Sequence, residues 1–283
     1  MLRCFNDCFA ALALWLTIYA LQRRQWAVAV LVYSWGLGTK MTLLLILPAL
    51  ATVLFQGRGF TGSLRMAGLI LQTQILLAIP FLAQNGRGYL ARAFELSRVF
   101  DYEWTVNWRM LDESLFLSTA FAVVLLALHA AVLFVFVAHR WLRPSQRSLW
   151  SLLPSMIQGK APLTPREEML VSTRVTADFV MTSLLTANII GLLFARSLHY
   201  QFYAYLAWTT PYLLWRATGS PVVVCALWAA QEWAWNVFPS TPASSATVVA
   251  VLATTVVLVW RGTRQNQLVR TTLPKGELSK KTR

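Results

Sequence analysis

The stretch that decides the fold is FLSTAFAVVLLALHAAVLFVFVAH, residues 116–139, which contains no Asp, Glu, Lys or Arg. It is longer than the roughly 20 apolar residues that an α-helix needs to cross the hydrocarbon core of a bilayer. The chain around it has 283 residues, of which 57% are hydrophobic and 13% are charged. A typical soluble domain has about 25% charged residues. We therefore predict an all-α polytopic membrane protein.

Similar apolar runs recur along the chain and predict about nine membrane spans. The second and seventh runs are short, which is typical of broken, tilted or partly re-entrant spans. We expect one transmembrane domain over residues 1–262 and a basic tail over 263–283. The predicted spans cover residues 5–21, 26–38, 41–56, 64–83, 116–139, 178–196, 202–215, 221–238 and 244–260.

The basic residues predict how the chain is oriented. If the C-terminus is cytosolic, 18 of the 25 Lys and Arg residues lie on the cytosolic side, and the other side has seven basic and seven acidic residues. Cytosolic loops of membrane proteins carry an excess of Lys and Arg, which favours this orientation. The loop at about 140–177 is then cytosolic and the loop at about 84–115 lies on the far side. The net charge of +14 follows the loops, so it does not indicate nucleic-acid binding.

The C-terminal sequence LSKKTR predicts the compartment. Lys280 and Lys281 stand fourth and third from the end, as in the cytosolic dilysine signal that returns membrane proteins to the endoplasmic reticulum. Such a terminal signal is read by a receptor and is not an anchor. The alternative is a solvated basic tail after the last span. If the signal operates, the far side of the membrane is the lumen of the endoplasmic reticulum.

The predicted luminal side gathers polar and aromatic residues, above all in RVFDYEWTVNWRML, residues 98–111. Arg and Lys bind phosphate, whereas carboxylates, amides and aromatic rings suit sugars. The side therefore fits a lipid-linked sugar phosphate. No cysteine pair has the spacing of a metal site, so we expect no metal. The candidate substrate-binding residues are Lys40, Arg98, Asp101, Glu103, Trp104, Asn107, Arg109 and Glu232.

Each candidate has a plainer interpretation. The tryptophans and tyrosines suit an interfacial aromatic belt, and Lys40 suits a side chain that reaches back to the headgroups. Glu232 suits a structural pair with Arg196, His199 or Lys40. A transporter would bring inverted repeats and charges at the middle of the membrane, and the sequence has no repeat. A scaffold protein remains an alternative from a different class.

Four runs resemble one family, in order along the chain: FNDC (5–8), YLARAFELSRVFDYEWTVNWRML (89–111), SLHYQFYAYLAWTTPYLLW (197–215) and AQEWAWNVFPST (230–241). They are similar to the α-1,3-mannosyltransferases of the endoplasmic reticulum that act in N-glycan assembly. These enzymes extend the five-mannose dolichyl-diphosphate oligosaccharide with dolichyl-phosphate mannose. The resemblance implies a GT-C membrane fold, a luminal site, inversion at the anomeric carbon and no cofactor.

The resemblance also implies that His199, with Tyr200 and Gln201 beside it, binds the donor phosphate. The family carries its key acidic residue in a first luminal loop, and this chain begins at a position that matches a later span. We therefore expect an N-terminally truncated member and assign no general base to its acids. An inactive form or paralogue that still binds dolichol-linked lipid is the alternative.

Overall fold

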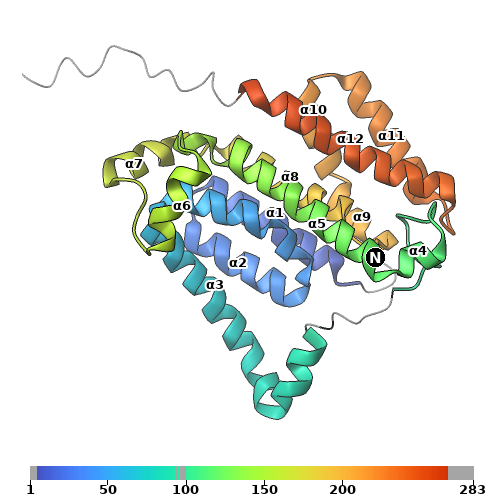
Figure 1. Cartoon of the computed structure of the whole chain (residues 1–283), viewed down its shortest axis with the longest axis horizontal. Coiled ribbons are helices and arrows are strands. Elements are labelled where there is room, and N and C mark those ends of the chain that lie inside the picture. Colours follow the sequence, from blue (N-terminus) through green and yellow to red (C-terminus); the bar gives the residue numbers. More distant parts are fainter. Residues whose placement is uncertain (1–4, 94, 96–99, 267–283) are drawn as a thin grey trace, which may run out of the picture.

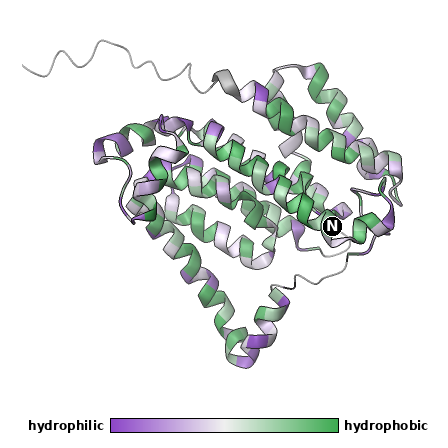
Figure 2. Cartoon of the chain, in the orientation of Figure 1, coloured by the Kyte–Doolittle hydropathy of each residue, from purple (hydrophilic) through white to green (hydrophobic). Residues whose placement is uncertain are grey.

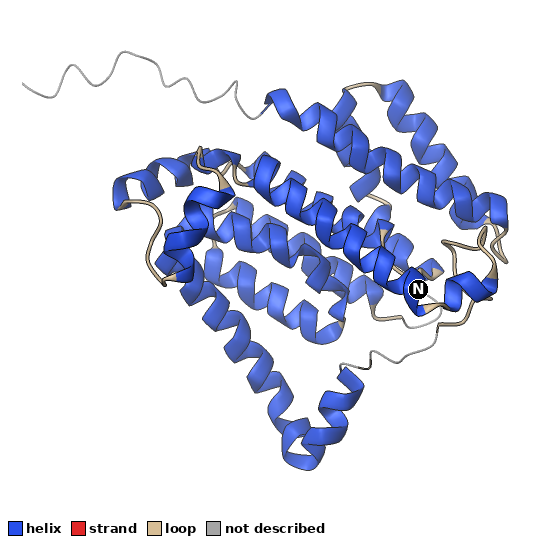
Figure 3. Cartoon of the chain, viewed as in Figure 1, coloured by secondary structure: helices blue, strands red, loops and turns tan. Residues whose placement is uncertain are grey.

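The computed structural model describes residues 5–93, 95 and 100–266, and these residues fold into helices joined by loops, without a β-strand (Figure 3). This confirms the predicted all-α class. The helices are α1 (Asp7–Gln22), α2 (Trp26–Thr39), η1 (Met41–Ile46), α3 (Leu47–Ala93), α4 (Glu113–Leu117), α5 (Thr119–Phe136), η2 (Val137–Trp141), η3 (Arg143–Ser145), α6 (Leu149–Ile157), α7 (Pro165–Arg174), α8 (Ala177–Leu193), η4 (Tyr200–Phe202), α9 (Tyr203–Leu206), α10 (Thr209–Thr218), α11 (Pro221–Asn236) and α12 (Pro242–Asn266).

Helices α1 and α2 form an antiparallel hairpin. The turn between them passes through Arg24, whose φ of 58° lies in the left-handed region. Small side chains then let the two helices approach closely, because Ala13 is fully buried and a methyl group added to Gly36 would overlap with it. The hairpin brings the start of α1 next to the end of α2, which matters for the site described below.

Helix α3 contains two breaks, and both fall outside the predicted spans: Gly59 lies between the spans 41–56 and 64–83, and Asn85 lies just after the second. At Gly59 the backbone has φ 73° and ψ 178°, a conformation that is essentially restricted to glycine. The amide of the next residue, Phe60, donates a hydrogen bond to the carboxylate of Glu168 on α7, at 2.8 Å. A second break lies at Asn85, which caps the last piece of α3 by accepting a hydrogen bond from Gly88 N at 2.9 Å. The predicted spans 41–56 and 64–83 are thus separated by a kink.

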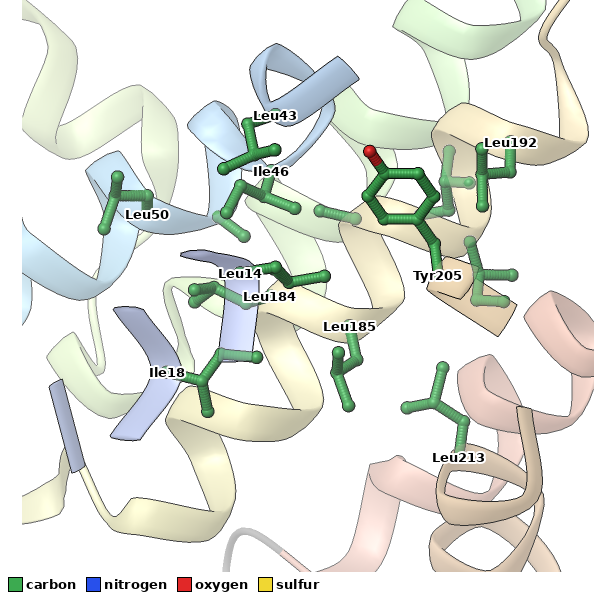
Figure 4. Packing of buried hydrophobic residues seen from close by; sticks show 14 of the residues in the cluster. Leu14, Ile18, Leu43, Ile46, Leu50, Leu184, Leu185, Leu192, Tyr205 and Leu213 are labelled. Carbon is green, nitrogen blue, oxygen red and sulfur yellow. The ribbon is translucent and has the colours of Figure 1, made fainter. Parts of the chain in front are cut away.

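Helix α8 lies at the centre of the bundle. Every residue from Thr182 to Leu193 is buried, because α8 packs against α1, α3, α10, α12 and η1. Figure 4 shows Leu184 and Leu185 of α8 among apolar side chains of the other helices. A helix that is buried on all sides needs apolar or small polar residues all round, and the sequence of α8 meets this requirement.

The ends of the bundle carry different elements. Helices α6 and α7 lie at one end, and α4 and α9 lie at the other (Figure 1). Hydrophilic residues gather around α7 and in the loop ahead of α4, and apolar residues cover the helices between them (Figure 2). We refer to the end formed by the start of α1, the loop 100–112, α4, η4 and α9 as the polar aromatic end.

The opposite end is built from the loop predicted at 140–177, which folds into α6 and α7. Arg24 fastens α7 to the α1–α2 turn, since its guanidinium donates to Ser172 Oγ at 3.0 Å and to Ser172 O at 2.8 Å. A small second core fills the space beneath these helices. Its buried residues are Phe55, Phe60, Leu142, Leu152, Leu163 and Val171.

The number of spans stays a prediction. Within the described residues, three helical segments are long and apolar enough to cross a membrane: Met41–Ala93, Thr119–Ser145 and Pro242–Thr263. A fourth results if α7 and α8, bent by 80° at their junction, are one span. Helices α1 and α2 are apolar but shorter. The predicted seventh span, 202–215, is broken into η4, α9 and α10.

Candidate substrate-binding site at the polar aromatic end

The loop 100–112 is fixed to the segment that follows α8. Val106 N donates to Leu198 O at 2.7 Å, and Asn107 makes contacts on both sides. The amide nitrogen of Asn107 donates to Ala195 O at 2.7 Å, and its amide oxygen accepts from Leu198 N at 2.7 Å. Only 1% of Asn107 is exposed. Its side chain therefore ties two distant segments together within the protein.

Trp108 and Arg109 continue this attachment. The indole nitrogen of Trp108 donates to Ala195 O at 2.9 Å, and Arg109 N donates to Ser245 Oγ on α12 at 2.7 Å. The guanidinium of Arg109 donates to Tyr102 O at 2.9 Å and lies 4.5 Å from the centre of the Tyr102 ring. Arg109 is half-buried and holds the loop in shape through these contacts.

His199 is oriented by the same loop. Its Nδ1 lies 3.1 Å from the backbone oxygen of Trp104. A carbonyl oxygen only accepts hydrogen bonds, so Nδ1 carries the hydrogen. The other ring nitrogen, Nε2, makes no hydrogen bond to any described residue. Nε2 is thus the ring nitrogen left for a ligand, and in a protonated ring its N–H can donate to an anionic oxygen.

Three aromatic rings pack together in the segments next to His199. The side chain of Trp104 is 46% exposed and stacks on Phe238, with ring centres 6.3 Å apart. The ring of Tyr200 contacts Phe238 edge-on, with ring centres 5.6 Å apart, and the Tyr200 hydroxyl donates to Val237 O at 2.6 Å. Gln201 is half-buried in η4. These rings form an apolar face of the kind on which sugars stack.

The acids of this end fall into two groups. Asp101 and Glu103 are exposed in the loop. Glu232 on α11 is half-buried and accepts a hydrogen bond from the hydroxyl of Tyr203, while Asn236 donates to Glu232 O at 2.8 Å. The suggested pairing of Glu232 with Arg196, His199 or Lys40 is therefore wrong: Arg196 donates to Leu117 O at 2.8 Å, and the other two also have different partners.

Asp7 and Lys40 form an ion pair that the sequence analysis did not predict. Asp7 begins α1 and Lys40 follows α2, so the hairpin places them together. The neighbouring Asn6 donates to Thr39 O at 3.0 Å and reinforces the same junction. The signal was present in the sequence: two helices of similar length in an antiparallel hairpin bring the first residue of one to the last residue of the other.

Three of the residues predicted from the sequence are not among those that the structure describes. Arg98, Lys280 and Lys281 lie outside the described residues. In the described part of the chain, no group of three or more His, Cys, Asp or Glu side chains is placed to hold a metal ion.

Long apolar helices define this chain as a polytopic membrane protein. Residues 1–245 match the family model described as the ALG3 protein, and the chain belongs to this family. It is a multi-pass membrane protein of the GT-C class. No solved structure matches the chain.

Three relatives are named Dol-P-Man:Man(5)GlcNAc(2)-PP-Dol alpha-1,3-mannosyltransferase. The Neurospora crassa protein is 57% identical over 94% of this chain, the human protein 37% over 93%, and the Arabidopsis thaliana protein 33% over 99%. The chain spans 60%, 58% and 64% of these relatives, respectively. Because the chain belongs to this family and contains long apolar helices, it is a membrane protein of the endoplasmic reticulum.

Proposed function

We propose that this protein transfers mannose in α-1,3 linkage from dolichyl-phosphate mannose to the five-mannose dolichyl-diphosphate oligosaccharide, with inversion at the anomeric carbon. The names of the relatives support the reaction. The observation that carries the site is the contact between His199 and Trp104, because it joins two of the runs on which the family resemblance rests. Donor, acceptor and membrane lipid are then the partners of the protein.

In this proposal His199 binds the donor phosphate through Nε2, with Tyr200 and Gln201 beside it in the chain. Trp104 offers its exposed ring to a sugar, and the exposed carboxylates of Asp101 and Glu103 offer acceptors for sugar hydroxyls. Asn107 and Arg109 position the loop, since both are held by contacts within the protein. Glu232 acts with Tyr203 at the edge of the site. None of these acids is proposed as the general base.

The proposed orientation places the polar aromatic end in the lumen and the C-terminus in the cytosol. Its support is the excess of Lys and Arg on the other side of the predicted membrane. Replacing Lys280 and Lys281 with serine should release a tagged full-length protein from the endoplasmic reticulum to later compartments. Unchanged retention in fractionated membranes would remove the dilysine signal from the proposal.

The proposed function is tested with the full-length protein purified from its own membranes. Incubation with dolichyl-phosphate mannose and the five-mannose acceptor should yield an oligosaccharide heavier by one hexose, and that hexose should be removed by a mannosidase specific for α-1,3 linkages. If well-folded protein forms no such product, the function is contradicted and the inactive, lipid-binding alternative takes its place.

A further inference from the structure

The pair of Asp7 and Lys40 is asymmetric. The side chain of Asp7 is 3% exposed, whereas that of Lys40 is 20% exposed. The acid is therefore inside the protein, and the lysine side chain is partly exposed at the polar aromatic end. A carboxylate that is almost fully buried is costly unless its charge is compensated, so Asp7 requires Lys40 to stay close to it.

Stability alone does not account for this pair. A buried ion pair often contributes little to stability compared with apolar residues of similar size. Here one carboxylate oxygen of Asp7, Oδ1, binds Lys40, and the other, Oδ2, makes no hydrogen bond within the described part of the chain. An arrangement optimised for stability would use both oxygens. The contact between Oδ1 of Asp7 and the ammonium group instead fixes the position of Lys40.

Lys40 points to the segment that carries His199. Its Nζ lies 4.7 Å from the centre of the Phe202 ring, and Phe202 is the last residue of η4, the turn that follows His199 directly. An ammonium group has three N–H donors, of which Asp7 takes one. The aromatic ring attracts the positive charge but accepts no conventional hydrogen bond. Lys40 therefore keeps donors available beside the predicted phosphate-binding residues.

We infer that Lys40 is a second cation for the phosphate of a polyprenyl-phosphate lipid, and that Asp7 is the positioning residue that holds Lys40 beside η4. This inference rests on the proposed function and names the ligand chemistry of the same site. Lys40 supplies a point charge and up to two N–H donors to phosphate oxygens, and His199 supplies one directed donor. Asp7 does not touch the lipid.

The test measures binding, so that it does not depend on transfer. The full-length protein, in detergent or nanodiscs, is titrated with dolichyl phosphate and, separately, with dolichol. The parent protein should bind the phosphate more tightly than the alcohol. Lys40→Ala should weaken binding of dolichyl phosphate by about tenfold or more, the usual size of a lost charged hydrogen bond, and should leave binding of dolichol unchanged. Lys40→Arg should restore most of the preference.

A double-mutant cycle tests the role of Asp7. Asp7→Asn alone should weaken binding of dolichyl phosphate by a smaller factor than Lys40→Ala. In the Lys40→Ala background, Asp7→Asn should have no further effect on phosphate binding, because a positioning residue acts only through the residue that it positions. Lys160→Ala is the matched control, since Lys160 is an exposed lysine near α6 at the opposite end, and should bind as the parent does.

Two results would overturn the inference. The first is well-folded Lys40→Ala protein that binds dolichyl phosphate as the parent does. The second is an Asp7→Asn effect of equal size with and without Lys40, which would make Asp7 structural only. Mannose transfer is measured in parallel on the parent. A parent that binds the phosphate through Lys40 but transfers no mannose contradicts the proposed reaction and leaves this inference standing.

Discussion

The imidazole Nδ1 of His199 lies 3.1 Å from the backbone oxygen of Trp104, although 95 positions separate the two residues in the chain. The contact orients the ring so that Nε2 is the nitrogen available to a ligand. It also ties the segment that carries His199 to the loop that carries the exposed Trp104, the two parts of the protein to which the proposed function assigns phosphate and sugar binding.

The two nitrogens of His199 predict different consequences for two conservative variants. Asparagine reproduces the Nδ1 donor to Trp104 but removes Nε2, and glutamine reproduces a donor at the position of Nε2. We expect His199→Asn to raise the KM for dolichyl-phosphate mannose by about 10- to 100-fold, the range expected for a lost charged hydrogen bond, and His199→Gln to raise it less. Steady-state kinetics on the full-length protein measure both. Equal KM values for the two variants would remove the phosphate role from Nε2.

We predict that replacing Asn107 lowers the stability of the protein. Asn107→Ala leaves the buried Leu198 N without a partner, whereas Ala195 O keeps the hydrogen bond from the Trp108 indole. An unpaired buried donor costs about 1–3 kcal/mol. Thermal unfolding followed by size-exclusion chromatography should show a clearly lower midpoint. The exposed residue Asp101 provides the control, because Asp101→Asn should change stability by less than about 0.5 kcal/mol. A parent-like midpoint for Asn107→Ala would show that the loop is not held by this side chain.

We predict that replacing two different glycines of α3 with alanine changes the stability of the protein in opposite directions. Gly59→Ala places a methyl group at φ 73° against the carboxylate of Glu168, and we expect destabilisation by about 1–3 kcal/mol. Gly68 lies in the helix with open space around it, so Gly68→Ala should stabilise the protein by about 0.5–1 kcal/mol through helix propensity. The same thermal assay compares them. If Gly59→Ala were neutral, the kink would not need glycine.

The side chain of Asp112 caps the N-terminus of α4, and we predict that this cap depends on pH. Ser114 donates to the Asp112 carboxylate from its backbone N–H and its hydroxyl, which lowers the pKa of Asp112. Since the pKa is lower in the folded state, the cap stabilises α4 fully above the ordinary aspartate pKa of about 4 and is lost as the pH falls below it. Hydrogen exchange of the α4 amides, corrected for intrinsic rates, should increase at low pH. Asp112→Asn should remove that dependence, and its persistence in the variant would contradict the prediction.

The sequence predicted the helical class and the concentration of polar residues at one end, because both follow from composition and from the position of residues relative to apolar runs. Individual roles depended on contacts between distant segments. Asn107 was predicted as a substrate residue, yet its amide is used by Ala195 and Leu198, far away in the chain. No local pattern reveals such partners.

The ion pair of Asp7 and Lys40 is a different case. Lys40 and the run FNDC, which contains Asp7, were noted separately, and the similar lengths of α1 and α2 were enough to predict that the two residues meet. The break at Gly59 falls between the predicted spans 41–56 and 64–83, so its place followed from the sequence, but its backbone conformation did not. Its conformation depends on Glu168, which belongs to a helix more than 100 positions away.

The most direct test of the site uses dolichyl phosphate carrying a photoreactive group close to the phosphate. After crosslinking to the full-length protein in native membranes, mass spectrometry of its peptides shows where the headgroup lies. We predict labelled peptides from residues 100–112 and 197–206, with labelling suppressed by unmodified dolichyl phosphate but not by dolichol. Labelling confined to α6 and α7, at the opposite end of the bundle, would contradict the account.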